Sequence, residues 1–337
     1  MQFDLSLISK YRTPLMGIAA LMIIVCHLLE YDVDRPAVVD KILWRGNYGV
    51  DIFLFLSGLG CWYSVSKGDS LYIWYRKRFV RIFVPYFLMQ IPFWAWRIAI
   101  GTFHLPHELL VFSTLGFWLH HVGAWYVALI LPLYLITPSI YIFLQSGKSI
   151  FRASLLVVIL IVACSLDIRM FNGGINETLR NVQGAFGRVP SFIIGMLIAP
   201  SVKCGKKVNI WWLILLPLGL YASIHVLMGG NVPEAWLIVL PIVVLLIIVL
   251  EKTSTHGIFY RFVTWMGMIS LESYLANIYL PAIAKYTLMP LRTDLPILTG
   301  GYVEYALIAV IGTLLAWGAS TISNPIINML SSNKSYK

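Results

Sequence analysis

Charged residues are scarce in this chain. Of its 337 residues only 25 are Lys or Arg and 15 are Asp or Glu, whereas 59% are hydrophobic and the mean hydropathy is +0.81. A soluble domain carries about twice this share of charged residues. The shortage excludes a soluble globular domain, because so much apolar surface requires lipid as its solvent.

Acidic residues are the scarcer of the two kinds, and the formal net charge is +10. If successive apolar stretches alternate across a membrane, sixteen of the 25 basic residues fall on one side, against only Asp4, Asp69 and Glu251. The positive-inside rule places that side, and with it both termini, in the cytoplasm. The basic composition therefore reflects loop bias and requires no nucleic-acid partner.

Cysteine is also rare, and none of the four cysteines has CxxC spacing. We expect them to be small buried hydrophobes rather than disulfides or metal ligands. His104, His107 and Glu108 form an HxxHE pattern, but Pro106 interrupts the helical spacing that a metal site would need. A polar outer loop is favoured there, and no metal is expected.

The apolar stretches predict a single all-α domain over 1–337, a polytopic bundle of about ten transmembrane helices. The first stretch lacks a small-residue cleavage site and is expected to be retained as a helix. Residues 101–121 are polar and fit an outer loop, an interfacial helix or a re-entrant segment. The expected spans are 14–30, 46–65, 79–100, 124–144, 151–167, 188–200, 210–228, 234–251, 262–284 and 298–328.

His27 lies in the first stretch, PLMGIAALMIIVCHLL, which is otherwise almost free of polar side chains. An ionisable group inside a membrane helix is costly and is by default a functional candidate. A neutral imidazole can take a proton from a hydroxyl and return it to a leaving group. The alternative is a histidine that is hydrogen-bonded between helices or reaches the interface.

The second stretch carries Asp51 within GVDIFLFLSG, where a carboxylate needs a partner or contact with water. An imidazole could be that partner, with Asp51 orienting it. Ser57 and Gly58 lie about two turns deeper, and close helix packing is the simpler explanation of such a small pair.

A basic cluster, YRKRFVR, opens the third stretch. The positive-inside rule and anionic lipid would account for such a cluster. Arg78 and Arg81, however, are three residues apart and share a helix face. With Lys77 beside them they could grip phosphates, which predicts a cytoplasmic cosubstrate that bears phosphate.

These motifs, in this order, resemble the acyltransferase-3 family of membrane acyltransferases. The resemblance rests on the histidine of the first stretch, G-V-D-x-F-x-x-x-S-G in the second and R-x-x-R-I-x-x-P-Y in the third. Two later segments agree: WYVALILPLYLITP at 125–138 is similar to the family's aromatic segment, and WMGMISLESYL at 265–275 to its G-x-x-S-L-E-x-Y segment.

The resemblance implies a ten-helix enzyme that transfers acetyl, or another short acyl group, from cytoplasmic acyl-CoA to a carbohydrate hydroxyl. It gives His27 the role of the essential histidine and makes Arg78 and Arg81 the arginine pair. It also makes Ser57–Gly58 the second-helix turn, which we expect to bind the acyl-CoA together with the arginine pair, and Glu272 the acidic residue of the late motif. Asp51 or Glu272 would orient the imidazole.

The chain departs from the family at two positions. Met16 stands where members often carry Arg or Lys, with Arg12 one turn earlier, and Asn277 stands where they often carry His. We expect Asn277, Trp125 and Tyr126 on the acceptor side, although tryptophans near span ends also fit an interfacial aromatic belt.

The sequence thus predicts an O-acyltransferase of the plasma (inner) membrane, with acyl-CoA, a glycan and the lipid bilayer as partners. The hydrocarbon core is ~30 Å thick, so a donor held at the arginines would need a channel to reach His27. A transporter or flippase for a lipid-linked glycan, with His27, Asp51 and Glu272 along its path, is an alternative. An inactive scaffold is another, and the oligomeric state, a homo-oligomer included, stays open.

Overall fold

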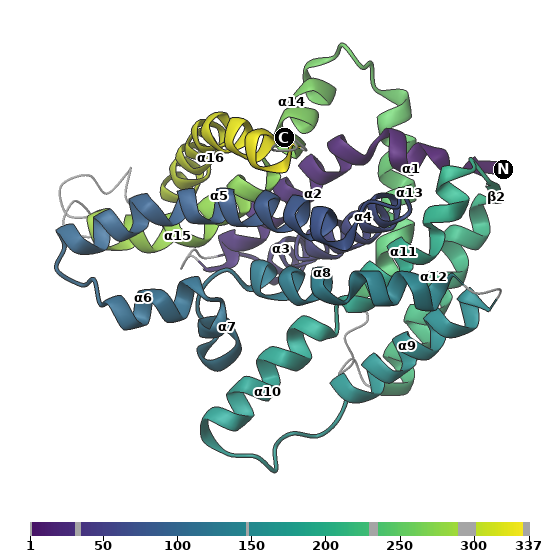
Figure 1. Ribbon diagram of the computed structural model, residues 1–337, viewed down its shortest axis with the longest axis horizontal. Coiled ribbons are helices and arrows are strands. Elements are labelled where there is room, and N and C mark those ends of the chain that lie inside the picture. The colour runs from purple at the N-terminus through teal and green to yellow at the C-terminus, as the bar shows by residue number, and fades with distance from the viewer. Residues whose placement is uncertain (1, 31–34, 146–147, 229–234, 289–300, 333–337) are drawn as a thin grey trace.

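The computed structural model describes residues 2–30, 35–145, 148–228, 235–288 and 301–332, and in these residues it is almost entirely helical (Figure 1). The only strands there are β1 (Gln2–Asp4) and β2 (Lys207–Asn209), which pair antiparallel with Phe3 opposite Val208. The all-α class predicted from the sequence is confirmed. The helices are α1 (Ser6–Lys10), α2 (Arg12–His27), the 3-10 turn η1 (Leu28–Glu30), α3 (Ala37–Arg45), α4 (Tyr48–Val65), α5 (Leu71–Ala99), α6 (Leu105–Phe112), α7 (Leu115–His120), α8 (Trp125–Leu144), α9 (Ser149–Cys164), α10 (Gly173–Phe186), α11 (Val189–Lys203), α12 (Ile210–Met228), α13 (Ala235–Lys252), α14 (Ile258–Met268), α15 (Ser270–Leu288) and α16 (Gly301–Ser331).

Within the described residues, six helical stretches are long and apolar enough to cross a membrane. They contain α4, α5, α8, α11, α13 and α16, and three shorter apolar helices, α2, α9 and α12, accompany them. These nine helices correspond to nine of the ten expected spans. The predictions at 46–65, 124–144 and 234–251 agree with α4, α8 and α13 to within two residues.

The remaining expected span, 262–284, is wrong as a single helix. The chain leaves helical geometry at Ile269 (φ −108°, ψ 17°), which separates α14 from α15. The two helices then differ in their main neighbours: α14 packs chiefly on α2, whereas α15 packs chiefly on α16 and α5 and also contacts α2. Periodicity could not reveal this break, since the residues on both sides are apolar and helix-compatible.

Helix α4 lies at the centre of the bundle and is buried almost all round, as its uniformly apolar sequence predicts (Figure 1). Glycines bring it close to α11: a Cβ added at Gly58 would collide with the carbonyl of Phe192, and one at Gly195 with that of Phe55. Close helix packing therefore explains the glycine of the Ser57–Gly58 pair.

A second close crossing joins α2 to α14. A Cβ at Gly17 would meet the Val263 carbonyl, and one at Gly267 would meet the Thr13 carbonyl. Glycine is thus required on both helices, and the contact fixes the position of the segment that precedes the break at Ile269.

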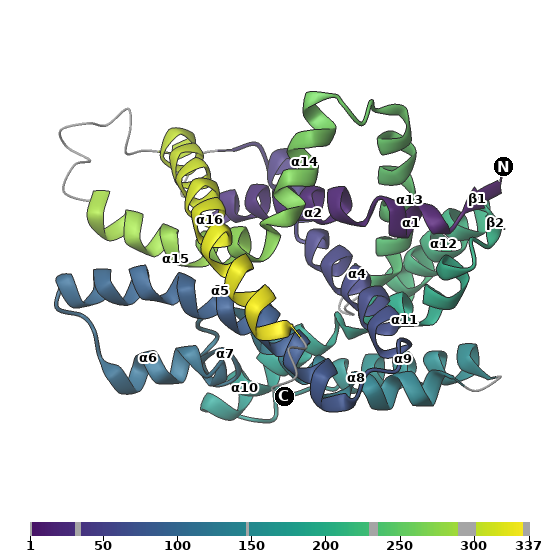
Figure 2. The ribbon, with the colours of Figure 1, turned by 45° about the horizontal axis from the view of Figure 1, so that its top comes forward.

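Helix α16 runs along α15 and crosses α5, and its last turn lies near the start of α5 (Figure 2). Arg76 of α5 donates through Nη2 to the carbonyl oxygen of Ser332, at 2.8 Å, just beyond that turn. The C-terminal helix is therefore held against the part of α5 that carries the basic cluster.

The polar segment 101–121 contains the two short helices α6 and α7. Glu108 is buried there, with Oε1 2.8 Å from Nη1 of Arg97 and Oε2 accepting from the indole of Trp94 at 3.1 Å. The carboxylate of the HxxHE pattern is thus engaged by α5, while His104 immediately precedes α6.

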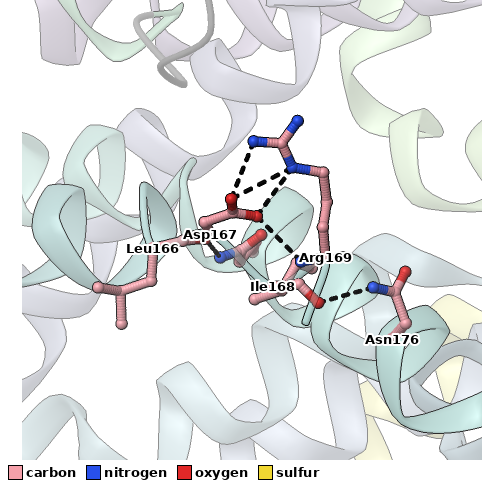
Figure 3. A network of polar contacts seen from close by, with 6 residues as sticks. Leu166, Asp167, Ile168, Arg169 and Asn176 are labelled. Atoms are coloured by element: carbon pink, nitrogen blue, oxygen red, sulfur yellow. Dashed lines mark hydrogen bonds and ion pairs between the residues drawn. The ribbon is translucent and has the colours of Figure 1, made fainter. Parts of the chain in front are cut away.

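The connection between α9 and α10 is held by its own polar side chains and by one from α10 (Figure 3). Arg169 donates from Nε and Nη2 to the two carboxylate oxygens of Asp167, at 3.0 and 2.9 Å, and Asn176 donates to the carbonyl of Ile168 at 2.8 Å. This connection is exposed, and the guanidinium lowers the pKa of Asp167 to about 2 by donating hydrogen bonds to its ionised form.

Candidate active site

A cavity of about 380 Å³ lies among α2, α4, α5, α8, α14, α15 and α16. It gathers Ser57, Arg78, Arg81, Tyr126 and Glu272, five of the residues predicted from the sequence, although they come from four different helices. Arg12 and Met16 of α2 line it as well. The segments that carry the resemblance are far apart in the chain, and they meet around this cavity.

One end of the cavity is cationic, because Arg12, Arg78 and Arg81 all line it. Arg81 is exposed and makes no hydrogen bond, ion pair or ring contact within the part of the chain that the structure describes. Arg12 is held more deeply. Its Nη2 reaches the Leu56 carbonyl at 3.4 Å, and its buried Nε has no hydrogen-bond partner among the described residues.

Arg78 is fixed by the protein. It donates from Nη2 to the Gly60 carbonyl, at 2.7 Å, and to Ser64 Oγ, and its guanidinium lies 5.8 Å from the ring centroids of both Trp74 and Tyr134. Such contacts orient a guanidinium plane and leave fewer donors for a ligand. The two arginines of the pair therefore differ in how much of each is available.

Glu272 is the one carboxylate among the described residues that line the cavity. It is buried at the start of α15, and Ser323 of α16 donates to its Oε1 at 2.9 Å. With three guanidiniums against one carboxylate, the lining carries excess positive charge. An anionic ligand would compensate that charge.

Burial increases from the cationic end toward the opposite end. Arg81, Met268 and Asn324 are exposed, whereas Ile23, Val50 and Phe53 are no more than 6% exposed. The cavity thus has a mouth at its charged end and an apolar end that is closed off by packing.

Two tyrosines complete the apolar end. The backbone N–H of Tyr126 donates to the hydroxyl oxygen of Tyr274 at 2.9 Å, and the Tyr126 and Ser57 hydroxyls are 3.2 Å apart. The Tyr126 ring packs on Tyr274 and Phe53, with centroid separations of 5.7 and 6.0 Å. This cross-linked cluster joins α4, α8 and α15, so the deep end has rigid walls.

His27 lies at the C-terminal end of α2, partly buried, and does not itself line the cavity. Helical geometry nevertheless places it on the face that does, since Arg12, Met16, Ile23 and His27 fall within about 60° of one another around the helix. It follows Ile23 by one turn, about 6 Å along the axis. The closed end of the cavity thus approaches His27.

Asp51 has a partner that we did not expect. Its carboxylate accepts from Arg188 Nη1 at 2.5 Å and from Ser191 Oγ at 2.8 Å, and Asp51 is fully buried. Arg188 also lies 5.6 Å from the ring centroid of Trp125 and donates to the Asn47 carbonyl. Both oxygens of Asp51 therefore bond to α11 and its N-terminal flank, in place of the imidazole that we expected as partner.

Sequence reasoning missed Arg188, although a signal existed. It stands at the predicted outer end of a span, where the positive-inside rule disfavours a lone cation. A buried carboxylate at the outer end of another span is its natural counterpart.

The remaining predicted residues lie away from the cavity. Lys77 pairs with Asp69 at 2.8 Å on the surface, and Asn277 is buried and donates to the Ser273 carbonyl at 2.8 Å. Gly58 serves the crossing with α11, and Trp125 packs against Arg188.

Residues 15–321 match the family described as Acyltransferase domain, which is more than half of the chain. No curated protein and no solved structure matches the chain. The matched residues contain every helix that lines the cavity except the first turn of α2 and the last turns of α16. The chain belongs to the acyltransferase-3 family and is an integral-membrane acyltransferase.

Proposed function

We propose that this protein is an O-acyltransferase of the plasma (inner) membrane. It takes acetyl, or another short acyl group, from cytoplasmic acyl-CoA and esterifies a hydroxyl of a cell-surface or exported carbohydrate. The observation that carries the proposal is the polarity of the cavity, which has a cationic mouth and an apolar closed end one helical turn from His27.

Acyl-CoA, like the cavity, has one charged end and one uncharged end. Its phosphates lie at one end and the acyl thioester at the other, joined by a long, mostly uncharged arm. Guanidiniums bind phosphate oxygens through charge-assisted, often bidentate hydrogen bonds, so Arg81 and Arg12 suit the phosphate end. The neutral thioester would occupy the end lined by Ile23, Val50 and Phe53.

The cavity also supports delivery of the acyl group across part of the membrane. From Arg12 to Ile23 the helix rises about 16 Å, roughly half of a ~30 Å hydrocarbon core. The basic residues at its mouth lie on the side that the charge distribution assigns to the cytoplasm. The cavity would thus supply the part of the required channel between Arg12 and Ile23, and its closed end stops one helical turn short of His27.

His27 acts as the general base in this proposal. Its imidazole accepts the proton of the acceptor hydroxyl while the hydroxyl oxygen attacks the thioester carbonyl. The carbon–sulfur bond then breaks, the ester forms, and the coenzyme A thiolate takes up a proton as it leaves. No metal takes part, because the thioester is already activated and the base is supplied by the chain.

The test is the ester content of the host's surface polysaccharide, measured by proton NMR before and after mild base. A deletion strain is complemented with the wild-type gene, with His27→Ala or with His256→Ala, whose histidine lies between α13 and α14 away from the cavity. Loss of a general base costs about 10²–10⁴-fold in rate. Wild type and His256→Ala should therefore restore the esters, and His27→Ala should not, at equal amounts of membrane protein.

Two outcomes would contradict the proposal. Restoration of wild-type ester levels by His27→Ala would remove the assigned base. Unchanged esters with less polymer at the surface of the deletion strain would indicate an exporter instead.

A further inference from the structure

We propose that Phe53, Val50 and Ile23 form a wall that sets the largest acyl group the donor cavity accepts. This inference rests on the proposed function and adds the selectivity of the same cavity to it. The three side chains line the end opposite the arginines, and each is at least 94% buried.

The orientation of the donor follows from charge. Arg81 lies at the exposed mouth and Arg12 beside it, so a ligand that places its phosphates there extends away from them into the cavity. The acyl group is the terminal part of such a ligand and reaches deepest. Its far end therefore meets the apolar wall.

The wall is rigid for two reasons. Phe53 packs on the Tyr126 ring at a centroid separation of 6.0 Å, and Tyr126 is fixed by the hydroxyl of Tyr274 at its backbone nitrogen. Phe53 and Val50 also belong to α4, whose crossing with α11 has no room for a methyl group. Close-packed interiors yield little to an added methylene, so a longer acyl chain has nowhere to go.

Binding of non-hydrolysable donors tests the wall without knowledge of the acceptor. The probes are coenzyme A and its S-ethyl, S-butyl and S-hexyl thioethers, titrated calorimetrically into the purified full-length protein in one detergent. The wild-type protein should bind the S-hexyl thioether at least about tenfold more weakly than the S-ethyl thioether, because one methylene in a confined apolar pocket is worth about 10–200-fold.

Two variants on α4 form a matched pair. Phe53→Leu removes volume from the wall and should reduce the preference for S-ethyl over S-hexyl by about tenfold. Phe55→Leu makes the same change two residues away, at a fully buried position that does not line the cavity, and should leave that preference unchanged. Val50→Ile adds a methylene and should increase the preference.

Each result decides the matter. The proposed wall would be wrong if Phe53→Leu left the preference for S-ethyl over S-hexyl unchanged, or if Phe53→Leu and Phe55→Leu changed that preference equally. Coenzyme A would still bind in either case, so the proposed donor would stand. Equal binding of the S-ethyl and S-hexyl thioethers by the wild type would also contradict the wall. If the wild-type protein does not bind coenzyme A, both the proposed function and the proposed wall are wrong. If Phe53→Leu does not fold, Ile23→Ala on α2 makes the same test from the other side of the wall.

Discussion

At the scale of single residues, the arginines of the cavity divide between structure and ligand binding. Arg78 is enclosed by Trp74 and Tyr134 and bonded to α4, whereas Arg81 has no such contact within the described residues. A guanidinium whose donors are unused by the protein can give them all to a phosphate. We therefore expect Arg81 to contribute to ligand binding, and Arg78 to contribute to the stability of the fold as well as to ligand binding.

Arg81→Ala should weaken coenzyme A binding without lowering the melting temperature. Hydrogen bonds to a charged group are worth about 1.5–3 kcal/mol, which corresponds to roughly 10–100-fold in Kd. Arg78→Ala should lower the melting temperature too, because it leaves the buried contacts of α4 and α5 without their partner. Calorimetric titration and a thermal melt of each purified variant measure both effects.

Lys67→Ala is the control for a general loss of positive charge, since Lys67 is exposed and does not line the cavity. Its coenzyme A affinity should stay within about twofold of wild type. Equal losses of affinity in Arg81→Ala and Lys67→Ala would show that only the net charge matters.

Residue chemistry was predictable from the sequence, but residue partners were not. The motifs named Ser57, Arg78, Arg81, Tyr126 and Glu272, and the structure brings all five to one cavity. Asp51 was matched with the nearest conspicuous histidine, whereas its partner Arg188 lies 137 positions further along the chain. Such a pairing depends on which helices are neighbours, and local patterns do not specify that.

At the scale of helices, close approach through glycine determines which helices are neighbours. Gly195 lets α11 lie against the Phe55 carbonyl of α4, and the crossing places α11 beside the helix that carries Val50 and Phe53. A methyl group there must push the two backbones apart, because the obstructing atom is a main-chain oxygen.

Gly195→Ala should lower the free energy of unfolding by about 1–3 kcal/mol, the usual cost of overpacking. Gly219→Ala is the matched control. It also replaces a helical glycine, in α12, but its new methyl meets nothing within 4 Å. Removing a glycine from a helix interior stabilises by about 0.5–1 kcal/mol, so this variant should melt at the same temperature or higher. Equal destabilisation in both variants, in thermal melts of the detergent-solubilised protein, would rule out the crossing as the cause.

The sequence predicted where most spans begin and end, but it missed the break that divides one of them into two helices. Apolar composition is enough to locate α8 or α13, since their limits are set by the edge of the hydrocarbon layer. The break at Ile269 depends instead on what α14 and α15 pack against. It places Glu272 at the first turn of a new helix, where the carboxylate lines the cavity and meets Ser323.

The connection from α9 to α10 offers a prediction for pH. Arg169 holds the pKa of Asp167 at about 2, below the ordinary value of 3.8. Because the folded pKa is depressed, this link contributes fully above the ordinary pKa and is lost as the pH falls through about 2. Both side chains are exposed, so the contribution is reduced by solvent.

In protein labelled with ¹³C at the aspartate carboxyl carbons, the Asp167 resonance should keep its ionised shift down to about pH 3. In Arg169→Ala the same resonance should titrate with a midpoint near the ordinary value, and Asp167→Asn identifies the signal by its absence. A wild-type midpoint already near the ordinary value would contradict the bidentate pair drawn in Figure 3.

At the scale of the whole molecule, the orientation in the membrane decides whether the cavity can serve a cytoplasmic donor. The mouth is formed by the start of α2, the basic part of α5, the junction of α14 and α15, and the last turns of α16. The first, second and fourth of these lie at helix ends that the charge distribution assigns to the cytoplasmic side, and the junction of α14 and α15 lines the same cavity beside them. If the orientation were reversed, the arginines would face a compartment without coenzyme A.

Cys204 reports on this orientation without any substitution, because it is exposed at the end of α11 on the predicted cytoplasmic side. A membrane-impermeant maleimide should label Cys204 of the wild-type protein only after the cells are permeabilised. Cys204→Ser should abolish the labelling that requires permeabilisation, since Cys61 is buried and Cys26 and Cys164 lie at the predicted outer ends of α2 and α9, where any labelling already occurs in intact cells. Asn172→Cys in the Cys204→Ser background places a thiol at the exposed connection before α10, and intact cells should label it. Labelling of Cys204 in intact cells, with Asn172→Cys protected, would reverse the orientation, place the mouth of the cavity outside the cytoplasm, and exclude coenzyme A as the donor.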